Sequence, residues 1–220
     1  MPPPKDLTLA GLIHDLNNVF QTLIEVADLL STDPKWLHMS NTILRAVERG
    51  NGITGSLDET SHFTGLDSIL DRSIQFTEDV WASGHTPVIR FVREIEPGLR
   101  FRGKALAMER VLVNLLVNAA RAATLSGEPG ELLVRASQIN DHLQIEVCDS
   151  GPGIDPKILL NIFQPGFSTR SNSSGLGLHI VRTIVEEHGG SVSAANREDR
   201  QGAHFTIRIP VQVKTLAAGA

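Results

Sequence analysis

Leucine recurs every seven residues through the first part of the chain, and this spacing is the strongest constraint on its fold. One row consists of Leu9, Leu16, Leu23 and Leu30, and a second row of Leu12, Val19 and Val26 lies between its members. Apolar side chains at alternating three- and four-residue spacing form the seam of a coiled coil or a helical bundle. Residues 5–30 are therefore expected to form a helix, which the sequence Ser31-Thr32-Asp33-Pro34 ends.

Residues 36–57 continue the apolar spacing and predict a second helix. Gly50, Gly52 and Gly55 weaken its lower half, because each glycine costs a helix interior about 1 kcal/mol relative to alanine. An isolated pair of helices leaves half of its apolar face exposed. We therefore expect residues 1–65 to form a helical hairpin that dimerises into a four-helix bundle.

From residue 66 onward the pattern changes to a mixture of helix and strand. Helical spacing covers residues 67–84, 105–123 and 176–188. Strands are expected at residues 88–95, 131–137 and 142–148, near 192, and at 203–209. The sequence thus predicts an α+β protein with a second domain over residues 66–220.

Composition excludes several classes of protein. The net charge of −5 disfavours nucleic-acid binding along the chain, and the single Cys148 rules out a disulfide framework. No apolar run approaches the roughly 20 residues that a membrane helix needs, and the N-terminus lacks the apolar core of a signal peptide. We expect a cytoplasmic protein that does not insert into membranes.

A polar cluster lies opposite the leucine seam of the first helix. His14 shares this face with Asn17, Asn18 and Gln21, and Asp15 follows it directly. A carboxylate near an imidazole can fix its tautomer and make the free nitrogen a better nucleophile. The competing interpretation is a solvated surface histidine, which is the commoner case for a lone histidine.

Two glycine-rich segments indicate a phosphate or nucleotide site. Gly175-Leu176-Gly177-Leu178 opens a helix, where backbone N–H groups favour anions, and Ser174 adds a hydroxyl donor. Asp149-Ser150-Gly151-Pro152-Gly153 follows a strand, so its carboxylate could accept a hydrogen bond from an exocyclic amine such as that of adenine. Each segment alone also fits an ordinary turn.

Two amides interrupt the apolar helix of residues 105–123. Asn114 and Asn118 lie one turn apart on the same face, and Arg121 follows three residues later. Core helices seldom place two amides in an apolar stripe without a partner. Oxygen ligands of this kind suit Mg²⁺ carried by a nucleotide.

Together these segments resemble the sensor histidine kinases of two-component signalling, whose ATP-binding half belongs to the GHKL superfamily. The similar segments are LIHDLNNVF (phosphoacceptor box), ERVLVNLLVNAARAA (N box), CDSGPGI (G1 box), IFQPGFSTR (F box), SSGLGLHIV (G2 box) and GAHFTIRIP (closing strand). Their order along nearly the whole chain makes the resemblance specific. It implies a GHKL (Bergerat-type) α/β sandwich, in which a mixed sheet packs on helices.

For the hairpin, the resemblance implies a phosphoacceptor. His14 would take the γ-phosphoryl group of ATP, while Asp15 would orient the imidazole and take its proton. Asn18 matches the position that in many relatives orients water for dephosphorylating the partner regulator. Val19 stands where relatives often have proline, so no kink is expected below the histidine.

For the second domain, the resemblance implies an ATP and Mg²⁺ site. Asn118 and Asn114 would hold Mg²⁺, and Arg121 would contact the phosphates. Asp149 would read the adenine amine, with clearance from Gly151 and Gly153. The remaining expected contacts are Thr206 near the base, Thr169, Arg170 and Ser174 in an ATP lid over residues 163–174, and Gly175, Leu176, Gly177 and Leu178 at the phosphates.

The function implied is a homodimeric protein-histidine kinase that phosphorylates His14 and passes the phosphoryl group to an aspartate of a response regulator receiver domain. Few residues precede His14, so the sensor domain would be a separate partner or a missing part of a longer protein. Two alternatives stay open. One is a phosphotransfer adaptor that relays phosphate through His14 without ATP. The other is a different GHKL ATPase, which Asn114 disfavours because hydrolysing relatives carry glutamate there.

Overall fold

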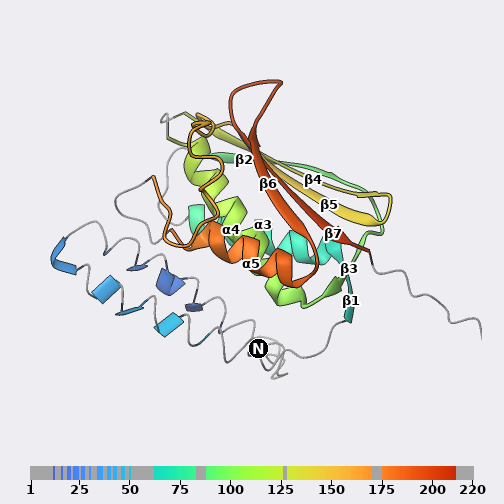
Figure 1. Cartoon of the computed structure of the whole chain (residues 1–220), viewed down its shortest axis with the longest axis horizontal. Coiled ribbons are helices and arrows are strands. Elements are labelled where there is room, and N and C mark those ends of the chain that lie inside the picture. Colours follow the sequence, from blue (N-terminus) through green and yellow to red (C-terminus); the bar gives the residue numbers. More distant parts are fainter. Residues whose placement is uncertain are drawn as a thin grey trace, which may run out of the picture. The chain divides into compact units, whose positions relative to one another are not determined.

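The computed structural model describes residues 62–82, 88–125, 128–169 and 175–211, together with individual residues between Leu12 and Gly50 (Figure 1). The chain divides into two compact units. The first contains residues 1–60 and 168–175, and the second contains residues 61–167 and 176–220.

The first unit is helical on both sides of a 3-10 turn, η1 (Pro34–Trp36). The ring of Phe20 lies against Gly50, where a Cβ atom would come within 2.3 Å of Phe20 Cζ. Two stretches that are distant in sequence therefore pack side by side, with Ala27 and Val47 buried. The described residues agree with the two predicted helices, while residues 51–57 lie outside the described part of the chain.

A five-stranded sheet forms the centre of the second unit. Its strands are, in spatial order, β2 (Ile89–Ile95), β4 (Gly130–Ile139), β5 (His142–Asp149), β7 (Ala203–Pro210) and β6 (Ser191–Asn196). The β2–β4 pair is parallel and the other pairs are antiparallel, so the sheet is mixed. Pro210, which cannot donate to a strand ladder, ends β7.

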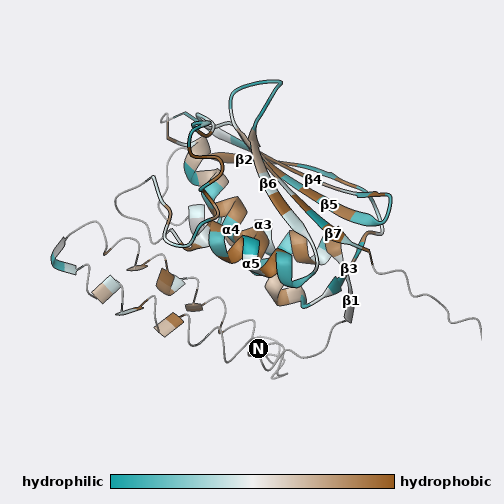
Figure 2. Cartoon of the chain, viewed as in Figure 1, coloured by the Kyte–Doolittle hydropathy of each residue, from teal (hydrophilic) through white to brown (hydrophobic). Residues whose placement is uncertain are grey.

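Three helices cover one face of this sheet: α3 (Leu66–Ala82), α4 (Ala105–Ala123) and α5 (Gly177–Glu187) (Figure 1). Apolar residues recur along α4, and Leu112 and Leu116 are fully buried against the sheet. Alternate residues of the central strands, including Ile145 and Ile207, belong to the same buried cluster. Figure 2 shows this apolar character along α4 and the strands.

A second, two-stranded sheet was not predicted. β1 (His62–Gly65) pairs antiparallel with β3 (Arg100–Gly103), beside the start of α3. Each strand has only four residues, which is too short for an alternating pattern to stand out. The pairing places residues 62–65 with the second unit, and the boundary between residues 65 and 66 stays a prediction.

Candidate nucleotide site

Asp149 is a buried carboxylate at the end of β5, with only 2% of its surface exposed. Its Oδ1 atom accepts hydrogen bonds from the backbone N–H of Gly151 at 2.8 Å and of Ala203 at 3.1 Å. Among the described residues, none donates a hydrogen bond to Oδ2. Burial raises the pKa of Asp149, although these two N–H groups and the charge of Arg197 oppose the shift. Asp149 thus keeps one acceptor oxygen available for a ligand.

Two glycines after Asp149 are required by the packing of the loop itself. A Cβ atom on Gly151 would lie 2.6 Å from the carbonyl oxygen of Ala122, near the C-terminal end of α4. Gly153 has φ +81°, and a Cβ atom there would lie 2.7 Å from Asn196 Oδ1. Both positions exclude a side chain because of neighbouring protein atoms, whether or not they also give clearance to a ligand.

The amides of α4 meet the first turn of α5. Asn114 is buried and its Nδ2 donates to the carbonyl oxygen of Arg110 at 2.8 Å, whereas Asn118 is half-buried. A Cβ atom on Gly177 would lie 3.0 Å from Asn114 Oδ1 and 3.7 Å from Asn118 Nδ2. The first N–H groups of a helix have no partner within the helix and attract anions. The fold therefore brings two predicted phosphate-binding segments together, with Leu176 as the residue before α5 and Leu178 in its first turn.

Arg121 lies in the last turn of α4 and is half-buried. It stands one turn beyond Asn118. The guanidinium charge of Arg121 is therefore on the same helix as the side-chain amides of Asn114 and Asn118.

Thr206 does not join this site. The strand register pairs Thr206 with Glu146, and its hydroxyl lies 3.1 Å from His204 Nε2. Side chains alternate between the two faces of a sheet, so Thr206 lies on the opposite face from Asp149. Ala203 takes the neighbouring position that was expected of Thr206, because its N–H donates to Asp149.

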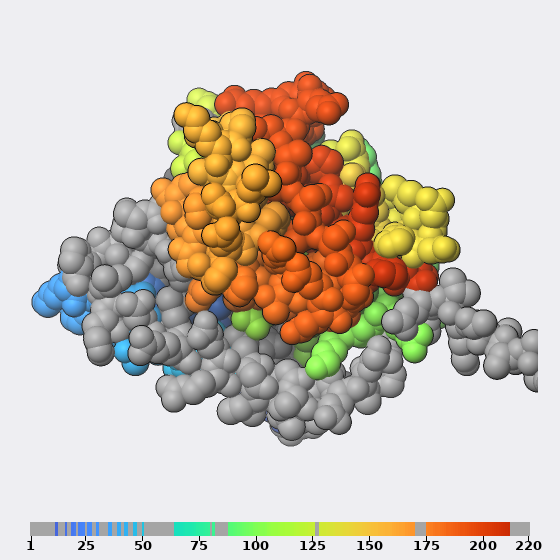
Figure 3. Space-filling view, in the orientation of Figure 1, coloured from blue at the N-terminus to red at the C-terminus, as the bar shows by residue number. Residues whose placement is uncertain are grey.

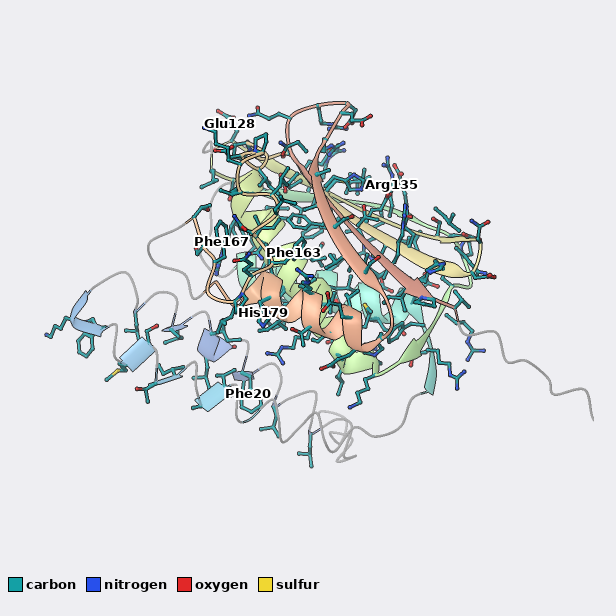
Figure 4. All side chains as sticks on the ribbon, in the orientation of Figure 1. Phe20, Glu128, Arg135, Phe163, Phe167 and His179 are labelled. Carbon is teal, nitrogen blue, oxygen red and sulfur yellow. The ribbon has the colours of Figure 1, made fainter. Side chains whose placement is uncertain are left out.

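The segment after β5 begins inside the core. Phe163 is buried and its ring meets that of Phe205 edge to face, with centroids 6.4 Å apart. Figure 4 shows Phe163 and Phe167 on this segment between β5 and α5. Phe163, where the lid was expected to begin, is thus an anchor in the core of the second unit. Further along, Thr169 is exposed and Gly175 has φ +65°.

Five predicted site residues lie outside the described part of the chain: His14, Asp15, Asn18, Arg170 and Ser174. Their roles stay predictions. Conversely, two residues that contact the loop after β5, Asn196 and Arg197, were not anticipated. Their only sequence signal is a polar turn after a strand, which does not reveal what they contact.

Residues 103–213 match the family model described as "Histidine kinase-, DNA gyrase B-, and HSP90-like ATPase". The chain belongs to this family. An ATP-binding domain of this family implies ATP binding, and the mixed sheet packed on helices confirms the predicted fold class.

Sensor histidine kinases are among the family members that the chain resembles. It is 41% identical over 216 residues to "Sensor histidine kinase ZraS" of Escherichia coli K12, covering 93% of this chain and 45% of that protein. The protein of the same name from Klebsiella oxytoca is 29% identical over 215 residues, again with 45% of its length covered. The chain therefore spans about half the length of these curated relatives.

Solved structures of histidine kinases have a fold similar to that of this chain. The "Mycobacterial sensor histidine kinase MprB" matches 69% of this chain and 97% of its own, with a TM-score of 0.60 and 27% identity. The nucleotide-free "Catalytic domain of histidine kinase ThkA" matches 69% and 95%, with a TM-score of 0.60 and 29% identity. The resemblance to sensor histidine kinases is confirmed. Within the described residues, no helix is long and apolar enough to span a membrane.

Proposed function

We propose that this chain is the kinase core of a two-component system, which phosphorylates His14 from Mg-ATP and passes the phosphoryl group to an aspartate of a response regulator. The observation that carries the proposal is the buried Asp149, whose Oδ2 atom has no hydrogen bond from any described residue. A buried acceptor without a donor is costly, and a ligand amine removes that cost.

The adenine end of the site is formed by Asp149. Its Oδ1 atom is held by two backbone N–H groups, which leaves Oδ2 to accept from the 6-amino group of adenine. Guanine carries a carbonyl oxygen at the same position, so a carboxylate there would repel it. Asp149 therefore supplies both affinity and choice of base.

The phosphate end is formed by α4 and α5. The side-chain oxygens of Asn114 and Asn118 are suited to hold Mg²⁺, which neutralises charge on the phosphates when it is bound. Arg121 adds a positive charge, and the first turn of α5 adds backbone N–H donors. Phosphoryl transfer needs little covalent help from the protein, so positioning and charge neutralisation provide most of the rate.

The hairpin supplies the acceptor. A ring nitrogen of His14 attacks the γ-phosphorus, a phosphorus–nitrogen bond forms, and the bond to the β-phosphate oxygen breaks to release ADP. Asp15 orients the ring and takes its proton. A regulator aspartate then takes the phosphoryl group from His14. Asn18 later orients water for dephosphorylation of the regulator.

The exposed seam of the first unit supports a homodimer. Leu12, Leu16, Val19 and Val26 are 41–53% exposed in the single chain. These residues recur at heptad spacing, so a second copy can cover them as a four-helix bundle. We place this ATP-dependent core in the cytoplasm and its sensing function in a separate or additional domain.

The two alternatives fit the site less well. An adaptor that does not use ATP has no use for the buried Asp149 or for the meeting of Gly177 with two asparagines. A GHKL enzyme that simply hydrolyses ATP needs a carboxylate to activate water, and Asn114 stands at that position. Transfer to a protein side chain accounts for both features.

Incubation with γ-labelled ATP and Mg²⁺ tests the proposal. The wild-type chain should form an acid-labile, base-stable phosphoprotein, as expected of phosphohistidine. His14→Gln should abolish the label while ADP still binds, and His142→Gln, an exposed residue of β5, is the matched control and should keep it. Persistent labelling of His14→Gln would remove His14 as the acceptor. If ATP does not label the chain, but the chain passes a phosphoryl group from another phosphoprotein through His14, the adaptor alternative would be favoured.

A further inference from the structure

Asn196, the last residue of β6, bonds to a main-chain residue beyond the glycine turn that follows Asp149. Its Oδ1 atom accepts from the N–H of Ile154 at 2.6 Å, and its Nδ2 atom donates to the carbonyl oxygen of Ile154 at 2.8 Å. One side chain thus satisfies both polar groups of one backbone residue, as a neighbouring strand would. The far end of the loop of residues 149–154 is fixed to the end of β6.

Arg197 fixes the near end of the same loop. Its side chain is 4% exposed, and two of its guanidinium nitrogens donate to the two carboxylate oxygens of Asp199 at 3.0 and 2.8 Å. The third nitrogen, Nη1, donates to the carbonyl oxygen of Asp149 at 3.4 Å. Hydrogen bonding from Arg197 holds the pKa of Asp199 well below its usual range, so this ion pair persists at neutral pH.

The turn between β6 and β7 is shaped to reach this loop. The N–H of Arg197 donates to the carbonyl oxygen of Gly202 at 2.9 Å, which closes the turn. A Cβ atom on Gly202 would lie 2.0 Å from the carbonyl oxygen of Asp149, so only glycine allows this approach. Figure 3 shows the turn, in red, beside the yellow-orange segment that follows β5.

Further contacts join both the loop of residues 149–154 and the β6–β7 turn to Glu131 of β4. The backbone N–H of Glu131 donates to Ser150 Oγ at 2.9 Å. The Glu131 carboxylate forms ion pairs with Arg200 at 3.0 Å and with Arg90. The loop of residues 149–154 is therefore held at its start, within it and at its end.

We propose that Asn196 and Arg197 are positioning residues for nucleotide recognition, acting through the loop that carries Asp149; this rests on the proposed function. A loop with two glycines has many conformations when it is unbraced. Ligand binding must then also order the loop, and that cost lowers affinity. Bracing by the β6–β7 turn fixes the direction of Asp149 Oδ2 before adenine arrives.

The test compares Asn196→Ala with the wild-type chain. Losing both hydrogen bonds to Ile154 should raise the KM for ATP about tenfold in autophosphorylation. The kcat at saturating ATP should stay within about twofold, because bound nucleotide orders the loop itself. Preference for ATP over GTP should fall, since a less fixed carboxylate discriminates less between an amine and a carbonyl.

Ser73→Ala is the control for stability alone. It removes a buried hydrogen bond from Ser73 Oγ to the carbonyl oxygen of Ile69 within α3. It should lower the melting temperature without changing the KM for ATP or the preference of base. If Asn196→Ala behaves like Ser73→Ala, the positioning role is wrong.

Asn196→Asp and Arg197→Lys keep the proposal testable if Asn196→Ala does not fold. Asn196→Asp retains the acceptor for the N–H of Ile154 and should restore part of the affinity. Arg197→Lys keeps the charge but loses the paired contact with Asp199, and should raise KM. Wild-type affinity and base preference in both variants would overturn the inference.

Calorimetry with ADP separates the two proposals. If the wild-type chain binds ADP but is not labelled by ATP, the kinase proposal fails. The affinity of Asn196→Ala for ADP, compared with wild type, then still tests the positioning role of Asn196. If the wild-type chain does not bind ADP, both are overturned.

Discussion

The two ends of the proposed nucleotide site differ in how far their polar groups already make hydrogen bonds within the protein. At the proposed adenine end, Asp149 Oδ1 and the backbone of Ile154 are held by hydrogen bonds, whereas Asp149 Oδ2 accepts none from the described residues. At the proposed phosphate end, the side-chain amide of Asn118 makes no hydrogen bond within the described part of the chain. The side-chain amide of Asn114 bonds there only to the carbonyl oxygen of Arg110.

This difference suggests a division of tasks. A braced loop recognises one chemical group at a fixed position, which suits the choice of adenine. The side-chain amides of Asn114 and Asn118 are the groups that we propose hold Mg²⁺ on the phosphates. The predictions below separate losses of transfer from losses of recognition.

The largest effect should come from the phosphate end. Asn118→Ala removes an oxygen that we propose holds Mg²⁺, so kcat for autophosphorylation should fall several hundredfold. Affinity for ADP measured without Mg²⁺ should change little. Asn161→Ala, at a turn after β5, is the control and should keep normal turnover. Equal losses of metal-free binding and turnover would contradict the division.

Asp149→Asn should strongly weaken recognition at the proposed adenine end. The amide can still accept from Gly151 and Ala203, but its N–H₂ group then faces the adenine amine, with two donors opposed. Affinity for ADP should fall about a hundredfold in calorimetry. Asp155→Asn, at an exposed turn, should bind normally. Unchanged affinity in Asp149→Asn would place the base elsewhere.

The same variant gives a pH test in the absence of nucleotide. Burial raises the pKa of Asp149 above its unfolded value, so the native state keeps this proton to a higher pH than the unfolded chain. The stabilising contribution is complete below the ordinary carboxyl range and is lost as pH rises through the native pKa. Asp149→Asn should therefore gain free energy of unfolding relative to wild type as the pH rises above the ordinary carboxyl range in urea titrations. A relative loss over this range would contradict the direction of the shift.

Gly151→Ala should act through packing. Its Cβ atom would meet the backbone of Ala122 at 2.6 Å, and a helix backbone cannot move aside as a flexible side chain can. The free energy of unfolding should fall by about 1–3 kcal/mol. Gly65→Ala, whose nearest atom would be 4.0 Å away, should change it by less than about 0.5 kcal/mol. Equal stability of the two variants in urea would contradict the close packing.

Thr206→Val should have the smallest effect. Thr206 lies on the sheet face opposite Asp149 and contacts His204, so the KM for ATP should stay within about twofold of wild type. A large rise in KM would restore Thr206 to the adenine site.

The positions of many proposed site residues could be predicted because they depend on local spacing. The bounds of α4 agree with the predicted helix, and helical period alone places Asn114 and Asn118 on one face. Strand alternation likewise predicts β5 and places Asp149 at its end. The short β1 and β3 were missed because four residues carry too little pattern.

The position of Thr206 shows what local pattern cannot supply. Alternation gives the two faces of β7, but which residue stands beside Asp149 depends on the register between β7 and β5. That register puts Ala203 at Asp149 and Thr206 on the other face. A motif match without register therefore assigned the contact to the wrong side of the sheet.

By itself, the amino-acid sequence determined the family, the central helices and strands, and the identities of Asp149, Asn114 and Asn118, because these depend on periodicity and on motifs within short segments. Only the tertiary structure decided that Gly177 lies beside the two asparagines, that Ala203 and not Thr206 lies beside Asp149, and that Asn196 and Arg197 hydrogen-bond to residues 149–154. These contacts join residues that are dozens of positions apart, and strand register and helix packing bring them together.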